Sequence, residues 1–165
     1  MSTQDNLKEA FAGESQANRK YLAFSQKAKG EGFEKVSRLF QVVADAETIH
    51  ALKHLQTLKG VGSTLDNLKE AIAGEHHEFT DMYPGFIAEA EKDGNQQAKV
   101  SFHLANEVEK VHHKLYEKAL QAVEQKRDIQ TEAFFLCPVC GHVEENEAPG
   151  RCPVCGAPGA SFKQY

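Results

Sequence analysis

The chain contains two copies of one arrangement of acidic and imidazole side chains: a lone glutamate, followed by a Glu-x-x-His pair. The six residues are Glu14, Glu47 and His50 in the first copy, and Glu75, Glu109 and His112 in the second. The surrounding sequence is repeated as well, since LKEAFAGE at residues 7–14 returns as LKEAIAGE at residues 68–75, 61 positions later. Because residues three apart share one helix face, two such half-sites predict a single site for two metal ions inside four helices.

The ligand types indicate which metals and which ligand roles to expect. Carboxylates with one imidazole per metal suit iron or manganese. Glu47 and Glu109 are the natural bridging ligands, because each shares a helix face with a histidine. Glu14 and Glu75 are then expected to be terminal ligands, one for each metal.

The two copies differ at the third residue after the lone glutamate, which is Ala17 in the first and Glu78 in the second. Glu78 is either a solvated helix residue or a fifth carboxylate beside one metal. Five negative charges exceed the four positive charges of a diferrous pair but not the six of a diferric pair. Charge balance therefore favours Glu78 as a ligand in the oxidised state and a neutral His50 in the reduced state.

Two Cys-x-x-Cys motifs lie near the C-terminus, as CPVCG at residues 137–141 and again at residues 152–156. The four cysteines are Cys137, Cys140, Cys152 and Cys155, and their spacing is typical of a tetrathiolate metal site. The glycine after each second cysteine allows backbone N–H groups to approach the sulfur atoms. The spacing leaves the metal open: zinc would make an inert ribbon, whereas iron would make a one-electron carrier.

The helices that must position the first site are visible as apolar residues at helical spacing. We expect helices over about residues 4–29, 33–58, 65–92 and 95–125. In all four, the glutamates and histidines replace apolar residues on the buried stripe, where uncompensated carboxylates are costly and metal cations would compensate them. Pro84 lies inside the third helix and should kink it or remove one of its hydrogen bonds.

The helical pattern ends after about residue 127. Residues 128–134 resemble a linker, and residues 135–165 are rich in proline and glycine. About 30 residues cannot fold on a hydrophobic core alone, so a metal must hold this segment together. The expected organisation is a helical domain at residues 1–127, the linker, and a small metal-binding domain.

Composition limits the function classes. The 165-residue chain has a formal net charge of −5 and no basic run, which argues against a nucleic-acid partner. No stretch of about 18 apolar residues is present, and the opening residues MSTQDN precede no apolar segment, so we expect neither a membrane span nor a secretory signal. Clustered cysteines without such a signal indicate metal binding in a reducing compartment, hence a cytoplasmic protein.

Together these features resemble the rubrerythrins. The resemblance rests on the segments AGESQA and AGEHHEFTDMYP, both Glu-x-x-His pairs and the two CPxCG motifs, and covers almost the whole chain. It implies an all-α, ferritin-like four-helix bundle followed by a rubredoxin-like domain with one iron. It also implies a di-iron peroxidase that reduces hydrogen peroxide to water. Electrons would come from rubredoxin or a NAD(P)H-dependent reductase and pass through the rubredoxin-type iron.

The resemblance also assigns individual residues. The implied di-iron ligands are Glu14, Glu47, Glu75, Glu78, Glu109 and His112, with His50 exchanging against Glu78. Tyr21 and Tyr83 lie two helical turns beyond the lone glutamates and could hydrogen-bond ligand carboxylates. The remaining histidines are interpreted as surface or supporting residues: His54, His76, His77, His103, His113 and His142.

Two other functions would use part of the same pattern. A ferritin-like protein that oxidises or stores iron would use the helical site, but would not need a tetrathiolate domain. A structural protein with a zinc ribbon would keep the cysteines, but would not need buried carboxylates.

The short connection between the second and third helices suggests how the chain assembles. In a bundle of the implied kind these helices run parallel, so a chain that closes on itself must return about 30 Å along the axis. Residues 60–64 span at most about 17 Å. Exchange between two chains avoids the return, so we expect a domain-swapped homodimer. Each di-iron site would combine Glu14, Glu47 and His50 of one chain with Glu75, Glu78, Glu109 and His112 of the other.

Overall fold

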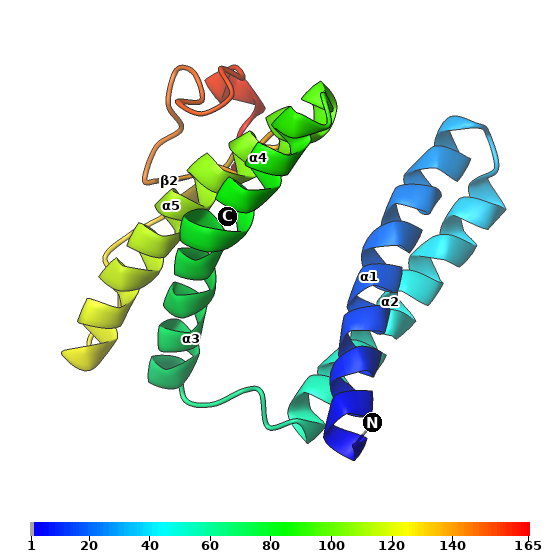
Figure 1. Cartoon of the computed structure of the whole chain (residues 1–165), viewed down its shortest axis with the longest axis horizontal. Helices are drawn as coiled ribbons and strands as arrows, with labels where there is room; N and C mark the ends of the chain where they lie inside the picture. The colour runs from blue at the N-terminus through cyan, green and yellow to red at the C-terminus, as the bar shows by residue number, and fades with distance from the viewer. Residues whose placement is uncertain (1) are drawn as a thin grey trace. The chain divides into compact units, whose positions relative to one another are not determined.

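The computed structural model describes residues 2–165 of the chain. Long helices make up most of it, and a small antiparallel sheet lies near the C-terminus (Figure 1). The chain divides into two compact units, one ending at Gly62 and one comprising Ser63–Tyr165, and each is described by itself. Within residues 2–165, no helix combines the length and the apolar character that a membrane span requires.

The first unit is a hairpin of two antiparallel helices, α1 (Thr3–Gly30) and α2 (Glu34–Thr57) (Figure 1). Small residues allow the two helices to approach closely, and Ala44 is completely buried between them. The Nδ2 group of the buried Asn18 donates to the Ala44 carbonyl and to Thr48 Oγ1, both at 2.7 Å. These bonds satisfy a polar side chain inside the hairpin and fix the register of the helices that carry the first half-site.

The second unit begins with a continuous helical segment that changes its winding once. It comprises α3 (Thr64–His77), a π-helical turn η1 (Glu78–Met82) and α4 (Tyr83–Lys92). The following helix α5 (Gln96–Glu124) packs against all three. The expected disturbance at Pro84 is thus a π-helical turn that ends just before the proline, and the helix continues beyond it.

The sequence repeat is also a structural repeat. Capping boxes start both α1 and α3, formed by Ser2 with Asp5 and by Ser63 with Asp66. Each unit also contains a trio of packed aromatic rings: Tyr21, Phe24 and Phe40 in the first, and Tyr83, Phe86 and Phe102 in the second. Equivalent capping residues are 61 positions apart, whereas equivalent ring positions are 62 apart. The extra residue of the second unit coincides with the π-helical turn.

The C-terminal module is a three-stranded antiparallel sheet in the order β2-β1-β3. Its strands are β1 (Phe134–Leu136), β2 (Val143–Glu145) and β3 (Lys163–Gln164), and a 3-10 turn, η2 (Gly159–Ser161), precedes β3. The two Cys-x-x-Cys segments form matching turns, each closed by a glycine N–H that donates to the carbonyl of the first cysteine. The closing glycines, Gly141 and Gly156, have φ angles of +88° and +76°, which only glycine adopts without strain.

Candidate metal centres

The first half-site lies on the α1–α2 hairpin. Glu14 projects from α1, and Glu47 and His50 project from α2, so that their potential ligand atoms lie within 4.8 Å of one another. The His50 Nδ1 atom is 2.8 Å from Glu47 Oε2 and 3.8 Å from Glu14 Oε1. The imidazole is 56% exposed on this unit. The predicted triad is therefore assembled, with one ligand on α1 and two on α2.

The second half-site has the same plan on α3 and α5. The His112 Nδ1 atom is 2.8 Å from Glu109 Oε2 and 4.0 Å from Glu75 Oε2. Potential ligand atoms of the three residues again lie within 4.8 Å of one another. All three side chains are less exposed than that of His50.

The carboxylates and the imidazole of this half-site shift one another's pKa values. Burial raises the pKa of Glu75 to about 7, assisted by its hydrogen bond with Glu109 and by repulsion from that carboxylate. A hydrogen bond from His112 lowers the pKa of Glu109, and the same bond raises the pKa of His112. Burial and repulsion from Glu109 thus disfavour the charged form of Glu75, as expected for a donor set suited to a metal cation.

Glu78 is the first residue of the π-helical turn and is only partly exposed. Burial raises its pKa, followed by repulsion from Glu109. Burial also raises the pKa of the Tyr83 phenol, and the charges of Glu78, Glu109 and Glu75 raise it further. Both side chains therefore lie within electrostatic reach of the half-site, which supports a place for Glu78 beside it.

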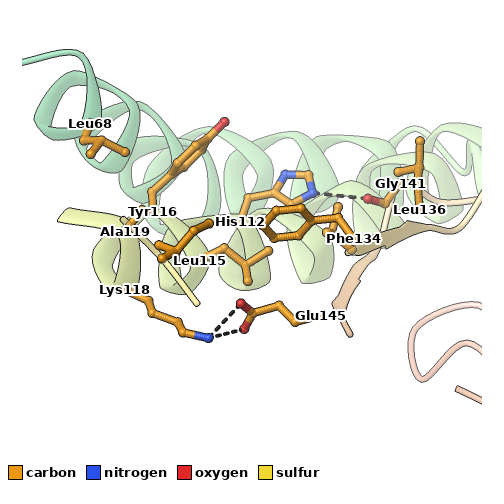
Figure 2. A pocket seen from close by; sticks show the side chains of 12 residues that line it. Leu68, His112, Leu115, Tyr116, Lys118, Ala119, Phe134, Leu136, Gly141 and Glu145 are labelled. Carbon is orange, nitrogen blue, oxygen red and sulfur yellow. Dashed lines mark hydrogen bonds and ion pairs between the residues drawn. The ribbon is translucent and has the colours of Figure 1, made fainter. Parts of the chain in front are cut away.

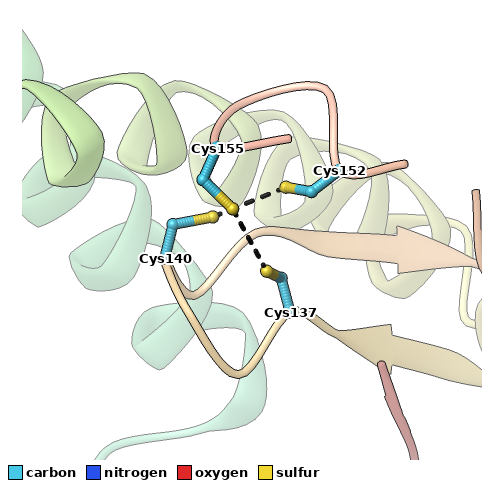
Figure 3. A group of neighbouring side chains, drawn as sticks. All are labelled: Cys137, Cys140, Cys152 and Cys155. Atoms are coloured by element: carbon cyan, nitrogen blue, oxygen red, sulfur yellow. Dashed lines mark hydrogen bonds between the residues drawn. The ribbon is translucent and has the colours of Figure 1, made fainter. Parts of the chain in front are cut away.

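The four cysteine sulfurs converge on one point between the two turns of the C-terminal module (Figure 3). The Sγ atoms of Cys137 and Cys155 are 3.6 Å apart, as are those of Cys140 and Cys152, and all four are free thiols. A tetrahedral metal with bonds of about 2.3 Å needs sulfur–sulfur distances of about 3.8 Å, so the donor set fits one ion.

The backbone of the module already favours a thiolate at Cys137. Burial alone would raise the pKa of this thiol. Together, the backbone N–H groups of Cys140 and Val139 and the thiols of Cys155 and Cys140 outweigh burial, and the pKa of Cys137 falls to about 7. Donation of N–H groups to sulfur is the role that the sequence pattern predicts for such turns.

The structure adds residues near the two centres that sequence spacing did not reveal. His112 Nε2 lies 3.1 Å from the carbonyl oxygen of Gly141, 29 residues away in the chain, and Lys118 forms an ion pair with Glu145. His142, interpreted from sequence as a surface or supporting residue, is 4% exposed and packs edge-on against Phe162. No periodic signal marks such contacts, because they join residues that are far apart in the sequence.

An apolar cleft of about 530 Å³ separates α5 from the C-terminal module (Figure 2). Its walls include Leu115 and Ala119 of α5, Phe134 and Leu136 of β1, and Val143 of β2. The His112–Gly141 contact and the Lys118–Glu145 pair also border it. The module is thus held to α5 at its edges, over a cleft that protein atoms do not fill.

Two helix pairs that each carry a glutamate and a Glu-x-x-His pair, followed by a tetrathiolate ribbon, define a ferritin-like dimetal-carboxylate protein with an appended metal domain. The family model for rubrerythrin matches residues 5–120, and the model for the rubrerythrin rubredoxin-like domain matches residues 135–163. The chain belongs to the rubrerythrin family, which confirms the fold and the family predicted from the sequence.

Known relatives match over nearly their whole length. The chain is 34% identical to rubrerythrin-2 of Clostridium acetobutylicum, over 99% of this chain and 96% of the relative. It is 36% identical to nigerythrin of Nitratidesulfovibrio vulgaris, over 99% of this chain and 87% of the relative. A solved structure of fully reduced, all-ferrous nigerythrin matches 100% of this chain and 87% of that chain, with a TM-score of 0.60 and 34% identity.

Family membership defines the metals and the general chemistry. Rubrerythrins are oxidoreductases that carry a di-iron site and a rubredoxin-type iron site, and they belong to the defence against oxidative stress. The carboxylate–histidine clusters and the cysteine cluster of this chain correspond to those two sites.

Proposed function

We propose that the protein is a non-haem di-iron peroxidase that reduces hydrogen peroxide to water, with electrons relayed through the rubredoxin-type iron. The observation that carries the proposal is the contact between the two centres of one chain. His112 of the carboxylate cluster lies 3.1 Å from the carbonyl of Gly141, the residue that follows Cys140 in the tetrathiolate cluster. A structural zinc ribbon would not need such a contact.

The side chains have distinct proposed roles. When bound, the iron pair supplies two electrons and Lewis acidity to the O–O bond of peroxide. Glu47 and Glu109 are proposed bridging ligands, because each already shares a hydrogen bond with the histidine of its own helix. The other proposed di-iron ligands are Glu14, His50, Glu75, Glu78 and His112. Cys137, Cys140, Cys152 and Cys155 would hold the relay iron.

Glu78 and His50 are proposed to alternate as ligands between the oxidised and reduced states. Within its hairpin, the His50 ring is in contact through Nδ1 with Glu47 and Glu14. Glu78 is a carboxylate in a region that already holds Glu75 and Glu109, and its pKa is raised by burial first and then by repulsion from Glu109. Additional positive charge at the metals would favour its approach.

The choice of oxidant tests the proposed function. Anaerobically reduced, iron-loaded protein is expected to react much faster with hydrogen peroxide than with dioxygen, consuming one peroxide for each electron pair and evolving no dioxygen. A ferritin-like iron oxidase, the second candidate, would instead prefer dioxygen and retain excess ferric iron.

A red colour of the oxidised protein would indicate rubredoxin-type iron, since a zinc ribbon is colourless. Stopped-flow spectra and an oxygen electrode give both readouts.

The proposed electron donor is rubredoxin or a NAD(P)H-dependent reductase, and the proposed location is the cytoplasm. Both proposals follow from the family and from a tetrathiolate site, which requires reduced cysteines.

We also propose that two chains exchange hairpins to complete the di-iron sites. The Gly60 N–H bonds back to the Leu55 carbonyl, so the chain is still folded onto the end of α2 at residue 60. Counted from that residue, the four remaining steps to Thr64 extend at most about 14 Å, within the limit of about 17 Å for all five residues. The helical residues from His50 to Thr57 and from Thr64 to Glu75 occupy about 27 Å of axis. A ferritin-like bundle closed within one chain would require the chain to travel back along that length.

Complementation tests the exchange. One chain carries Glu14→Ala and Glu47→Ala, the other carries Glu75→Ala and Glu109→Ala, and the two are co-expressed with different tags. An exchanged heterodimer is expected to have one intact and one empty site, hence half the di-iron content of the wild-type dimer. Each variant alone, as control, should have none. A heterodimer without di-iron, or a monomeric wild-type protein, would exclude the exchange.

A further inference from the structure

We propose that the C-terminal module orients the imidazole of His112, so that the metal affinity of the helical site depends on the docking of the module onto α5. The inference rests on the proposed role of His112 as a metal ligand. The C-terminal module would then have a second function, which does not depend on electron transfer through its own metal.

The His112 ring is held at both nitrogens, and Figure 2 shows the contact of one of them with the Gly141 carbonyl. Nδ1 faces Glu109 and Glu75, and Nε2 faces the Gly141 carbonyl at 3.1 Å. A carbonyl oxygen can only accept, so Nε2 donates and carries hydrogen. Nδ1 is therefore the nitrogen left for a metal. In metal sites, an outer hydrogen bond of this kind fixes the orientation of a ligand histidine and increases its basicity.

The position of the Gly141 carbonyl depends on both the module and the helix. The Gly141 N–H donates to the Cys137 carbonyl at 3.0 Å, which closes the first cysteine turn. On the other side, Val108 of α5 is almost completely buried, and its Cγ1 atom lies 3.8 Å from the position that a Cβ of Gly141 would occupy. The Gly141 carbonyl, which accepts from His112, is thus positioned by the cysteine turn and by the contact of Gly141 with Val108 of α5.

A second contact holds the module at the far side of the cleft. Lys118 Nζ donates to both carboxylate oxygens of Glu145, at 2.7 and 2.8 Å, and the Glu145 carboxylate also accepts from Thr131. Because the cleft between the two contacts is not filled by protein atoms, tight apolar packing does not replace them. Reversing one charge would bring like charges together and favour undocking.

The first half-site provides an internal comparison. Among residues 2–165, the structure records contacts of the His50 ring only through Nδ1, to Glu47 and Glu14. His112 has an outer hydrogen-bond acceptor and His50 has none in its own unit. This difference gives a physical reason why His50, rather than His112, is the histidine suited to leave its metal.

Charge reversal and restoration test the coupling in the full-length protein. The variants are Lys118→Glu, Glu145→Lys and the double exchange, with Lys114→Glu as a matched control, because it makes the same charge change on α5 without touching Glu145. The tetrathiolate site is filled with zinc, and the helical site is titrated anaerobically with Fe²⁺. Each single variant is expected to bind Fe²⁺ roughly 10- to 100-fold more weakly. The double exchange should recover the wild-type affinity, and Lys114→Glu should retain it.

A second measurement does not involve iron at the helical site. In protein carrying only zinc, the Nε2–H proton of His112 should give a slowly exchanging NMR signal that both single variants lose and the double exchange regains. Unchanged Fe²⁺ affinity in the single variants would overturn the inference, as would a double exchange that stays weak. Failure of peroxide turnover with the coupling intact would instead overturn only the proposed function.

Discussion

Replacing Cys152 with serine is expected to abolish peroxide-dependent oxidation of the external electron donor, while the helical domain remains folded. The Cys152 sulfur lies 3.6 Å from that of Cys140 in the four-sulfur cluster, and a serine hydroxyl is a poor substitute for a thiolate ligand. Without its metal the small module cannot maintain its fold. Donor-linked turnover should therefore fall to background, a loss of at least about 100-fold relative to the wild-type rate.

The measurement separates the relay from the peroxide chemistry. Because the module is also proposed to orient His112, the Cys152→Ser variant is loaded with excess Fe²⁺, and unbound Fe²⁺ is removed before peroxide is added, so that only iron in the helical site can reduce it. Chemically reduced variant should still consume one equivalent of peroxide in a single turnover, and circular dichroism should show retained helix. Continued turnover with the external donor after loss of the tetrathiolate iron would show that this iron is not the relay.

Replacing Glu109 with alanine is expected to remove most of the iron from the helical site. Glu109 accepts the hydrogen bond of His112, lies beside Glu75, and is the proposed bridge, so its loss removes a ligand and disorders its neighbours. The loss of bound metal should also lower the Tm of the iron-loaded protein, because metal that binds only the folded state stabilises it. Iron content per chain and thermal unfolding provide the two readouts.

Glu78→Ala is the matched control for Glu109→Ala, since it removes one carboxylate from the same helical unit. It should leave two metals bound but slow the cycle between oxidation states, because Glu78 is proposed to serve as a ligand only in the oxidised state. Iron content close to that of wild type, combined with slower re-reduction, is the expected pattern. Equal loss of iron in the two variants would contradict the distinction between a bridging and an exchanging carboxylate.

The helices and the two clusters could be predicted because their signals are local. Apolar residues at helical spacing located all four helices, and Glu47 and His50 share a face wherever a helix forms around them. The Cys-x-x-Cys spacing likewise brought its four sulfurs together. In each case the geometry depends on neighbours in the chain.

Other features could not be predicted from local sequence patterns, because they depend on contacts between surfaces that meet only after folding. The contact of His112 with Gly141 requires the module to dock on α5, and no periodic pattern records the shape of that surface. The burial of His142 depends equally on Phe162, which arrives from the far end of the module. The π-helical turn at Glu78–Met82 could be predicted only in part, because the change of repeat spacing reveals an extra residue but not the type of helix that contains it.

That π-helical turn lies where the two copies of the sequence repeat differ in length by one residue. Up to Glu75 the second half follows the spacing of the first, and from Tyr83 onward it runs one residue later, so one additional codon lies between them. A wider turn absorbs the additional residue locally, and the aromatic trio at Tyr83 still matches its counterpart at Tyr21. Glu78 stands at the first position of this turn, where the first copy of the repeat has Ala17. A symmetrical ancestor built from two identical hairpins could thus have gained a further carboxylate near one half-site through one inserted codon and one substitution, while both aromatic trios kept their packing.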